Sequence, residues 1–134
     1  MLGGALALAV LPSLAWSADT PFVTLSSALV GAANVDPDLA RSYEAALRAG
    51  PDAVAMARLI WLASNAGGAT LLERIAGEGL TEAADLVVAA WYSGIVNGQV
   101  ITYTSSLAWN AVPFTKPNGY CGGAFGYWSD PPAS

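Results

Sequence analysis

The sequence predicts an all-α protein: a small bundle of about five to six short helices followed by an irregular C-terminal arm. Two observations predict this class. Up to about residue 96, apolar residues recur at helical spacing, and Asp-Pro and Gly-Pro pairs mark helix starts and stops. From Pro113 onward, glycine, proline and asparagine are too dense for a regular element. We therefore expect a signal peptide at 1–17, a helical domain over 18–112 and an extended arm over 113–134.

The first two helices are predicted from their ends. A short helix over residues 22–31 has Thr24 or Ser26 as a candidate N-cap. Asp36-Pro37 is a stronger start, because aspartate caps backbone N–H groups and proline suits the first helical position. Gly50-Pro51 then ends the second helix.

Three more helices follow. The one that Pro51-Asp52 opens is expected to turn this set of side chains inward: Val54, Ala57, Ile60 and Trp61. A short helix over 69–76 ends near Gly77. Thr81 is the expected N-cap of the longest helix, which Asn97-Gly98 breaks.

Residues 100–104 are ambiguous. They are rich in β-branched and aromatic side chains, which favours a strand, but no partner strand is evident. We therefore predict a helix over 102–110 instead. Across the domain the large apolar residues expected in the core are Tyr43, Trp61, Trp91, Ile95 and Tyr103.

Residues 1–17 have the pattern of a secretory signal peptide and contain no charged side chain. The apolar run from Leu2 to Leu14 has the length of a signal-peptide core, and Ala15-Trp16-Ser17 places small residues around a cleavage site. A retained membrane anchor is the alternative, but Pro12 and Asp19 leave the run shorter than the roughly 20 apolar residues that a spanning helix needs.

Composition excludes most chemistry that one chain performs alone. The sequence has no histidine and one cysteine, so it offers no Ser-His-Asp or Cys-His pair, no ordinary zinc site and no iron–sulfur cluster of its own. The glycines of 122–126 lack the strand–turn–helix context of a dinucleotide site. The net charge of −5 makes nucleic acid an unexpected partner. We expect no catalytic, cofactor-binding or metal-binding residue on this chain.

The C-terminal arm is aromatic, which a disordered tail is not. The chain is also 54% hydrophobic and only 11% charged, against roughly 25% charged in an ordinary soluble domain. The aromatic side chains either pack on the chain's own helices or anchor a partner, since aromatic residues dominate interface hot spots. The candidates for partner contact are Trp109, Tyr120, Phe125, Tyr127, Trp128 and Pro131.

Cys121 lies within this arm. An unpaired cysteine in an exported chain suggests an intermolecular disulfide or a free thiol. A small buried cysteine without a role is the alternative.

Three stretches of the C-terminal third resemble a known family. They are Ala-Ala-Trp-Tyr-Ser-Gly-Ile-Val at 89–96, the Val-Ile-Thr-Tyr and Leu-Ala-Trp pieces at 100–103 and 107–109, and the run from Tyr120 to Pro132. In this order and spacing they resemble the small (gamma) subunit of bacterial membrane-bound FAD-dependent sugar and polyol dehydrogenases, of the sorbitol, fructose and glucose dehydrogenase type.

The resemblance implies a non-catalytic role. In that family the large flavoprotein subunit binds FAD and an iron–sulfur cluster, and a multihaem cytochrome c subunit passes electrons to quinone. The small subunit carries a twin-arginine export signal and supports maturation of the large subunit. No twin arginine precedes Leu2 in this sequence. Some members have a cysteine at the place of Cys121 that bridges to the large subunit.

The expected function is therefore that of an accessory subunit rather than an enzyme. It would act in the periplasm, at the outer face of the inner membrane, with indirect membrane contact. Two alternatives stay open: an independent periplasmic helical adaptor or binding domain, and a lone enzyme that uses carboxylates.

Overall fold

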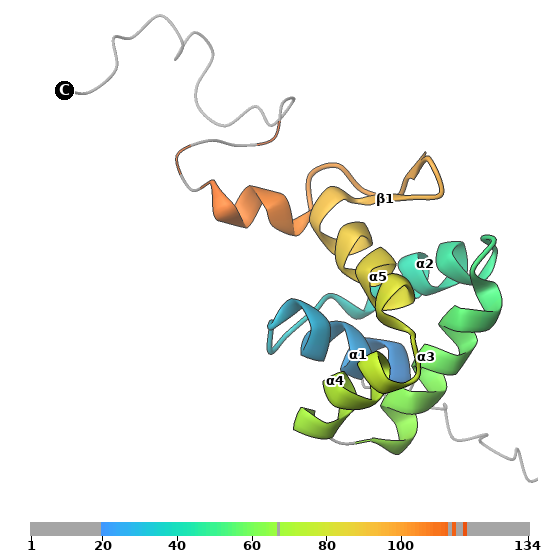
Figure 1. Ribbon diagram of the computed structural model, residues 1–134. Coiled ribbons are helices and arrows are strands. Elements are labelled where there is room, and N and C mark those ends of the chain that lie inside the picture. The colour runs from blue at the N-terminus through green and yellow to red at the C-terminus, as the bar shows by residue number, and fades with distance from the viewer. Residues whose placement is uncertain (1–19, 67, 113, 115–116, 118–134) are drawn as a thin grey trace, which may run out of the picture.

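The computed structural model describes residues 20–66, 68–112, 114 and 117, and Figure 1 shows them as a helical bundle with one small hairpin. This confirms the predicted all-α class. The elements in chain order are α1 (Pro21–Val30), α2 (Pro37–Arg48), α3 (Ala53–Asn65), α4 (Gly68–Gly77), α5 (Thr81–Ser93), β1 (Ile95–Val96), β2 (Gln99–Val100) and the 3-10 helix η1 (Leu107–Ala111).

The first two helices start in the same way, with a capping side chain followed by proline. Asp36 accepts hydrogen bonds from the backbone N–H groups two and three residues on, at 2.8 and 3.1 Å, as its position predicts. In α1 the cap is Thr20, whose hydroxyl accepts the N–H of Val23 at 3.3 Å. The predicted caps Thr24 and Ser26 are wrong, because both lie inside the helix.

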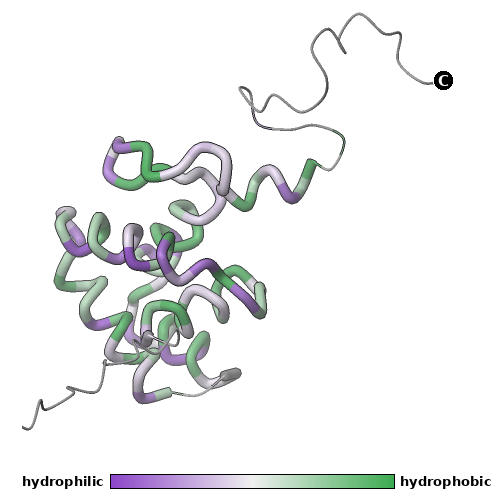
Figure 2. The backbone as a smooth tube through the Cα atoms, turned by 180° about the vertical axis from the view of Figure 1, so that it is seen from behind, coloured by the Kyte–Doolittle hydropathy of each residue, from purple (hydrophilic) through white to green (hydrophobic). Residues whose placement is uncertain are grey.

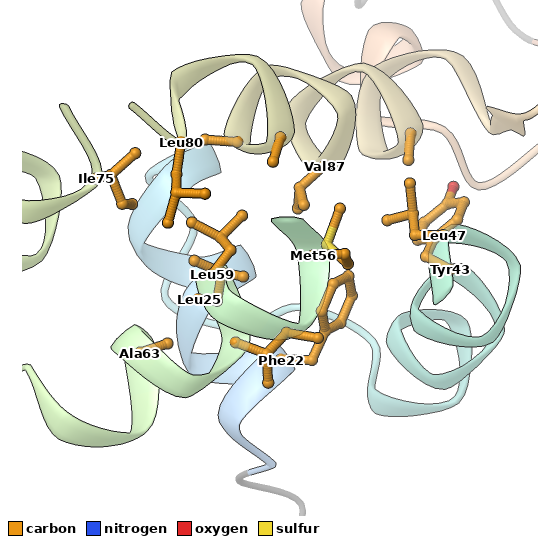
Figure 3. Close-up of a cluster of buried hydrophobic side chains, with 14 of the residues drawn as sticks. Phe22, Leu25, Tyr43, Leu47, Met56, Leu59, Ala63, Ile75, Leu80 and Val87 are labelled. Carbon is orange, nitrogen blue, oxygen red and sulfur yellow. The ribbon is translucent and has the colours of Figure 1, made fainter. Parts of the chain in front are cut away.

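The core forms where α1, α3 and α5 meet, with α2 and α4 closing the sides. Figure 3 shows Phe22 and Leu25 of α1 beside Met56 and Leu59 of α3, below Val87 of α5. Each of these side chains has no exposed surface. The remaining large members of the core are Tyr43, Leu47, Ile60, Leu62, Leu71, Ile75, Leu80, Trp91 and Val96.

The inward face predicted for α3 is confirmed at Ile60, which is buried, and wrong at Val54, Ala57 and Trp61, which are exposed. Trp61 is 48% exposed and Val54 is also on the surface, while Met56, Leu59 and Leu62 are buried. Apart from Ser64 and Asn65 in its last turn, the helix has Arg58 as its one polar residue, so periodicity alone does not fix which side faces inward. The charge of Arg58 determines which side faces solvent. Val54 and Trp61 lie four residues before and three residues after Arg58, on the same side of the helix, and are exposed with it.

Helix α5 begins and ends differently from the prediction. Its N-cap is Leu80, and Thr81 is the first helical residue rather than the cap. The helix ends at Ser93, because Gly94 adopts a left-handed conformation with φ of 73°. Ile95 is therefore outside the helix and 46% exposed, so its assignment to the core is wrong.

Two of the expected core residues do lie in the core. Tyr43 has no exposed surface and Trp91 is 2% exposed. Their rings meet edge to face, with centroids 4.9 Å apart, which joins α2 to α5.

A hairpin follows α5. Ile95 pairs with Val100 and Val96 with Gln99, around a two-residue turn in which Asn97 and Gly98 both have positive φ, 49° and 77°. Asn-Gly suits this turn, because both residues tolerate the left-handed region. The strand in this segment thus has its partner immediately before it in the chain.

The helix predicted over 102–110 is wrong. Only the 3-10 helix η1 forms, and residues 101–106 lie in an irregular stretch. Tyr103 falls in that stretch and is exposed, so it is not a core residue either. The backbone N–H groups of Ile101 and Thr102 bond instead to the carbonyl oxygen of Gly94, at 2.8 and 3.2 Å, which ties this stretch to the end of α5.

Within the described residues, no helix is long and apolar enough to cross a membrane. The predicted signal peptide at 1–17 and nearly all of the arm at 113–134 lie outside those residues, and the domain boundaries between them stay predictions.

Candidate functional site

The part of the chain that the structure describes holds no cluster of three histidine, cysteine, aspartate or glutamate side chains that could bind a metal. None of the aspartate and glutamate residues in this part is buried. The candidate functional features are therefore surfaces, and two of them carry exposed large apolar side chains.

The first surface lies where α5 ends, and Figure 1 shows it at the opposite end of the bundle from α4. We call it the hairpin end and define it by four exposed side chains: Tyr92, Ile95, Val100 and Tyr103. In Figure 2 the hairpin is hydrophobic on both sides of its hydrophilic tip.

The hairpin exposes its apolar residues because only one of its faces packs on the bundle. Val96 points into the core and is 4% exposed. Successive side chains alternate between the faces of a strand, so Ile95 and its cross-strand partner Val100 point the other way. Val100 is 65% exposed. The hairpin therefore presents an apolar pair that its own fold does not cover.

At least three hydrogen bonds besides the β-ladder hold the hairpin end against α2 and α5. Two are the bonds to Gly94 described above. The third joins the Asn97 side-chain amide to the carbonyl oxygen of Ala46, at 3.0 Å and 51 residues away in the chain. That carbonyl lies in the last turn of α2, where helical acceptors lack an intrahelical donor. The hairpin tip thus supplies a hydrogen-bond donor to a backbone carbonyl group at the C-terminal end of α2.

Trp109 fixes the start of the C-terminal segment against this end. Its indole N–H donates to the carbonyl oxygen of Tyr103 at 2.8 Å, and the two rings meet edge to face with centroids 5.6 Å apart. Trp109 is half-buried, and η1, which contains it, lies against α5. This candidate for partner contact therefore has a contact within the chain.

The second surface surrounds Trp61 on α3. The Arg58 guanidinium stacks over the Trp61 ring, 4.3 Å from its centroid, and donates to Glu78 at 2.8 Å. Arg74 also pairs with Glu78, at 3.5 Å. Hydrogen bonding to Arg58 holds the pKa of Glu78 below its ordinary value. This network carries two positive charges and one negative charge, and it shields one face of the indole.

The other residues predicted to contact a partner lie outside the described residues: Tyr120, Cys121, Phe125, Tyr127, Trp128 and Pro131. Sequence reasoning missed Tyr92 and Val100. The Asn-Gly turn flanked by Ile95-Val96 and Gln99-Val100 is the sequence feature that indicates the outward pair, since such a hairpin sends alternate residues to opposite faces.

Comparison with known protein families gives a match over most of the chain. No curated protein matches the chain significantly. The family model of the membrane-bound FAD-containing D-sorbitol dehydrogenase matches residues 3–132, which is nearly the whole sequence. The chain therefore belongs to the family of the membrane-bound FAD-containing D-sorbitol dehydrogenase.

Proposed function

We propose that this chain is the non-catalytic small subunit of a periplasm-facing FAD-dependent sugar or polyol dehydrogenase complex. In this role it supports the export, maturation and stability of the catalytic flavoprotein subunit. The observation that carries the proposal is the family match over residues 3–132 of a chain that has no histidine and one cysteine. A dehydrogenase family thus includes a chain that lacks histidine for acid–base catalysis and has too few cysteines to hold an iron–sulfur cluster.

The described residues do not fit an FAD site. A dinucleotide is commonly held where a strand leads through a glycine-rich loop into a helix. Here β1 and β2 are two residues long each, and the turn between them leads into the other strand. Oxidation of an alcohol also needs a base for the hydroxyl proton, which is most often histidine. FAD and an iron–sulfur cluster accordingly belong, in our proposal, to the flavoprotein subunit.

The family name states that the dehydrogenase is membrane-bound. We place this chain at the outer face of the inner membrane, with residues 1–17 as its export signal. Its contact with the membrane is indirect in this proposal, and a multihaem cytochrome c subunit takes the electrons from the flavoprotein.

Co-expression with and without this chain tests the proposal. The flavoprotein subunit produced together with the chain should be exported, retain flavin and reduce a dye with D-sorbitol as the trial substrate. Produced without it, the flavoprotein should be depleted from the periplasm. The chain purified alone should show no flavin absorbance and no dye reduction. Equal export and flavin content in both cultures would refute the accessory role, and activity of the chain alone would make it an enzyme.

Cys121 extends the proposal to a covalent link. We propose that it forms a disulfide with the flavoprotein subunit, since it is the one cysteine of an exported chain. A non-reducing gel of the complex should show a band near the summed mass that disappears with reductant and in Cys121→Ser. Separate bands without reductant would exclude the bridge and leave the non-covalent association to be measured.

A further inference from the structure

We infer that the hairpin end, rather than the surface around Trp61, is where the FAD-containing subunit docks. We also infer that it fits a partner surface that is apolar at its centre and basic at its edge. This inference rests on the proposed function and adds the place and the chemistry of the contact.

The distribution of exposed apolar residues favours the hairpin end. Nine large apolar side chains are exposed among the described residues, and four of them make up the hairpin end. A soluble monomer tolerates such residues singly, whereas gathering them at one place is typical of an interaction surface. Of the others, Val54 and Trp61 lie on α3, Leu72 on α4 and Leu86 on α5.

The hairpin end is also ordered before any partner arrives. The backbone bonds to Gly94 and the bond between Asn97 and Ala46 fix the hairpin on α5 and α2. The ring contact of Tyr103 with Trp109 fixes the segment that follows. A preorganised apolar surface loses little conformational freedom on binding, which favours affinity.

Charge indicates the chemistry of the partner. The solvent side of α5 carries Glu82 and Asp85 in the first half of the helix, about two to three turns before Tyr92, and neither forms an ion pair within the described residues. All four arginines in the described part pair with acidic side chains, including Arg48 near the hairpin tip: Arg41 with Asp38, Arg48 with Glu44, and Arg58 and Arg74 with Glu78. The approach to the hairpin end is therefore acidic, and a basic partner rim complements it.

The surface around Trp61 lacks these properties. Arg58 already covers one face of the indole, and its charge is partly balanced by Glu78. Chain continuity adds a further argument, because η1 lies against α5, the helix that leads into the hairpin, and the aromatic C-terminal residues follow η1 in sequence.

The test uses the full chain, tagged and co-expressed with its FAD-containing subunit. Val100→Asp and Tyr92→Asp place a charge on the hairpin end, one in the hairpin and one on the helix. Val54→Asp and Leu72→Asp are matched controls on α3 and α4, because they put the same charge at other exposed apolar sites. Thermal melting of each variant, purified alone, shows whether it folds.

We expect the flavoprotein retained by Val100→Asp and Tyr92→Asp to fall at least tenfold, while both controls retain it within about twofold of the wild type. The double variant Glu82→Lys/Asp85→Lys should lower retention, with the loss greatest at low salt, where charge attraction is strongest.

Failure of this inference is distinguishable from failure of the proposed function. If the wild-type chain retains no flavoprotein, the proposed function is wrong. If the wild type retains it and Tyr92→Asp, with an unchanged melting temperature, retains as much, the docking site is wrong while the function stands. If the Val54→Asp control loses as much flavoprotein as Val100→Asp and Tyr92→Asp, the inference that the hairpin end is the docking site is likewise wrong.

Discussion

The helical bundle and the segment that follows it use apolar residues in opposite ways. In the bundle, up to the end of α5, the large apolar side chains on the inner faces are buried and hold the helices together. From Gly94 to Val112 only Val96 is fully buried among the large ones, and Ile95, Val100 and Tyr103 are exposed. Hydrogen bonds to Gly94 and Ala46 hold that segment, together with the partial burial of Ile101 and Leu107 against the core.

The difference shows how one chain can be stable alone and still keep apolar surface for a partner. Burial in the bundle supplies the folding free energy, because burying a large apolar side chain is worth about 1.5–3 kcal/mol. Hydrogen bonds contribute less each, about 0.5–1.5 kcal/mol, but they are directional. The segment after α5 is therefore positioned without covering its own apolar residues.

The largest effect on stability should come from truncating a large side chain that is buried in the bundle. Trp91→Ala removes a side chain that is 2% exposed and packs on Tyr43, so it should lower the free energy of unfolding by about 3–5 kcal/mol. The free energy of unfolding of a domain of this size is only roughly 5–15 kcal/mol in total. Urea unfolding checks this, with Trp91→Phe as the control that keeps a ring and should cost less than about 1.5 kcal/mol. An unchanged midpoint in Trp91→Ala would place the indole outside the core.

The next effect tests the junction between the two regions. A methyl group on Gly94 would overlap the carbonyl oxygen of Thr102, and the residue has a positive φ of 73°. Gly94→Ala should therefore cost about 2–4 kcal/mol, from the strained backbone and the displaced segment. Gly98→Ala is a matched control: its φ is 77°, but the added methyl group meets nothing within 4 Å.

Gly98→Ala should cost about 1 kcal/mol, the strain of the left-handed backbone alone. The difference between the two urea midpoints then measures the overlap at Gly94. Equal costs at the two glycines would show that the segment moves aside freely, and that the hydrogen bonds to Gly94 do not position it.

Local signals in the sequence predicted much of the bundle. Asp36-Pro37 was sufficient to place the start of α2, because a cap and a proline act within one turn. Thr20-Pro21 has the same form and was missed in favour of residues inside α1. The inward side of α3 was predicted correctly only at Ile60, because Arg58 is the one charged residue that distinguishes the sides of that helix.

The candidate site was harder to predict because its exposure depends on tertiary packing. Whether Ile95 faces the core or solvent is decided by where α5 ends, and Gly94 ends it one turn earlier than periodicity suggests. Asn97-Gly98 was interpreted as a helix break, whereas the same pair forms the turn of a hairpin. No local pattern shows that Asn97 would reach Ala46, 51 residues away.

That long-range bond gives the third prediction. Asn97→Ala removes the donor to Ala46 and a residue that tolerates positive φ, so it should cost about 1–2 kcal/mol. Asn97→Gly keeps the backbone freedom and loses only the bond, so it should cost less. Hydrogen exchange should show faster exchange of the Ile101 amide in both variants, with the amides of α3 unchanged. Faster exchange throughout α3 would mean that the hairpin and the bundle unfold as one unit.

The smallest effect concerns a buried polar atom in the bundle. The Tyr43 side chain has no exposed surface, and its hydroxyl has no hydrogen-bond partner among the described residues. An unpartnered buried hydroxyl is destabilising, whereas the ring packing on Trp91 is favourable. Tyr43→Phe keeps the ring and removes the oxygen. Near neutral pH the free energy of unfolding should stay the same or rise by up to about 1 kcal/mol.

The same substitution has a signature at high pH. Burial raises the pKa of Tyr43 above its ordinary value of 10.0 in the folded chain. Above that value the unfolded chain releases the hydroxyl proton while the folded chain keeps it, so the stability present at lower pH is lost as the pH rises. Tyr43→Phe should therefore flatten the alkaline fall in stability by up to about 1.4 kcal/mol per pH unit. A loss of more than about 1 kcal/mol at neutral pH would instead give the hydroxyl a hydrogen-bond partner, such as a buried water molecule.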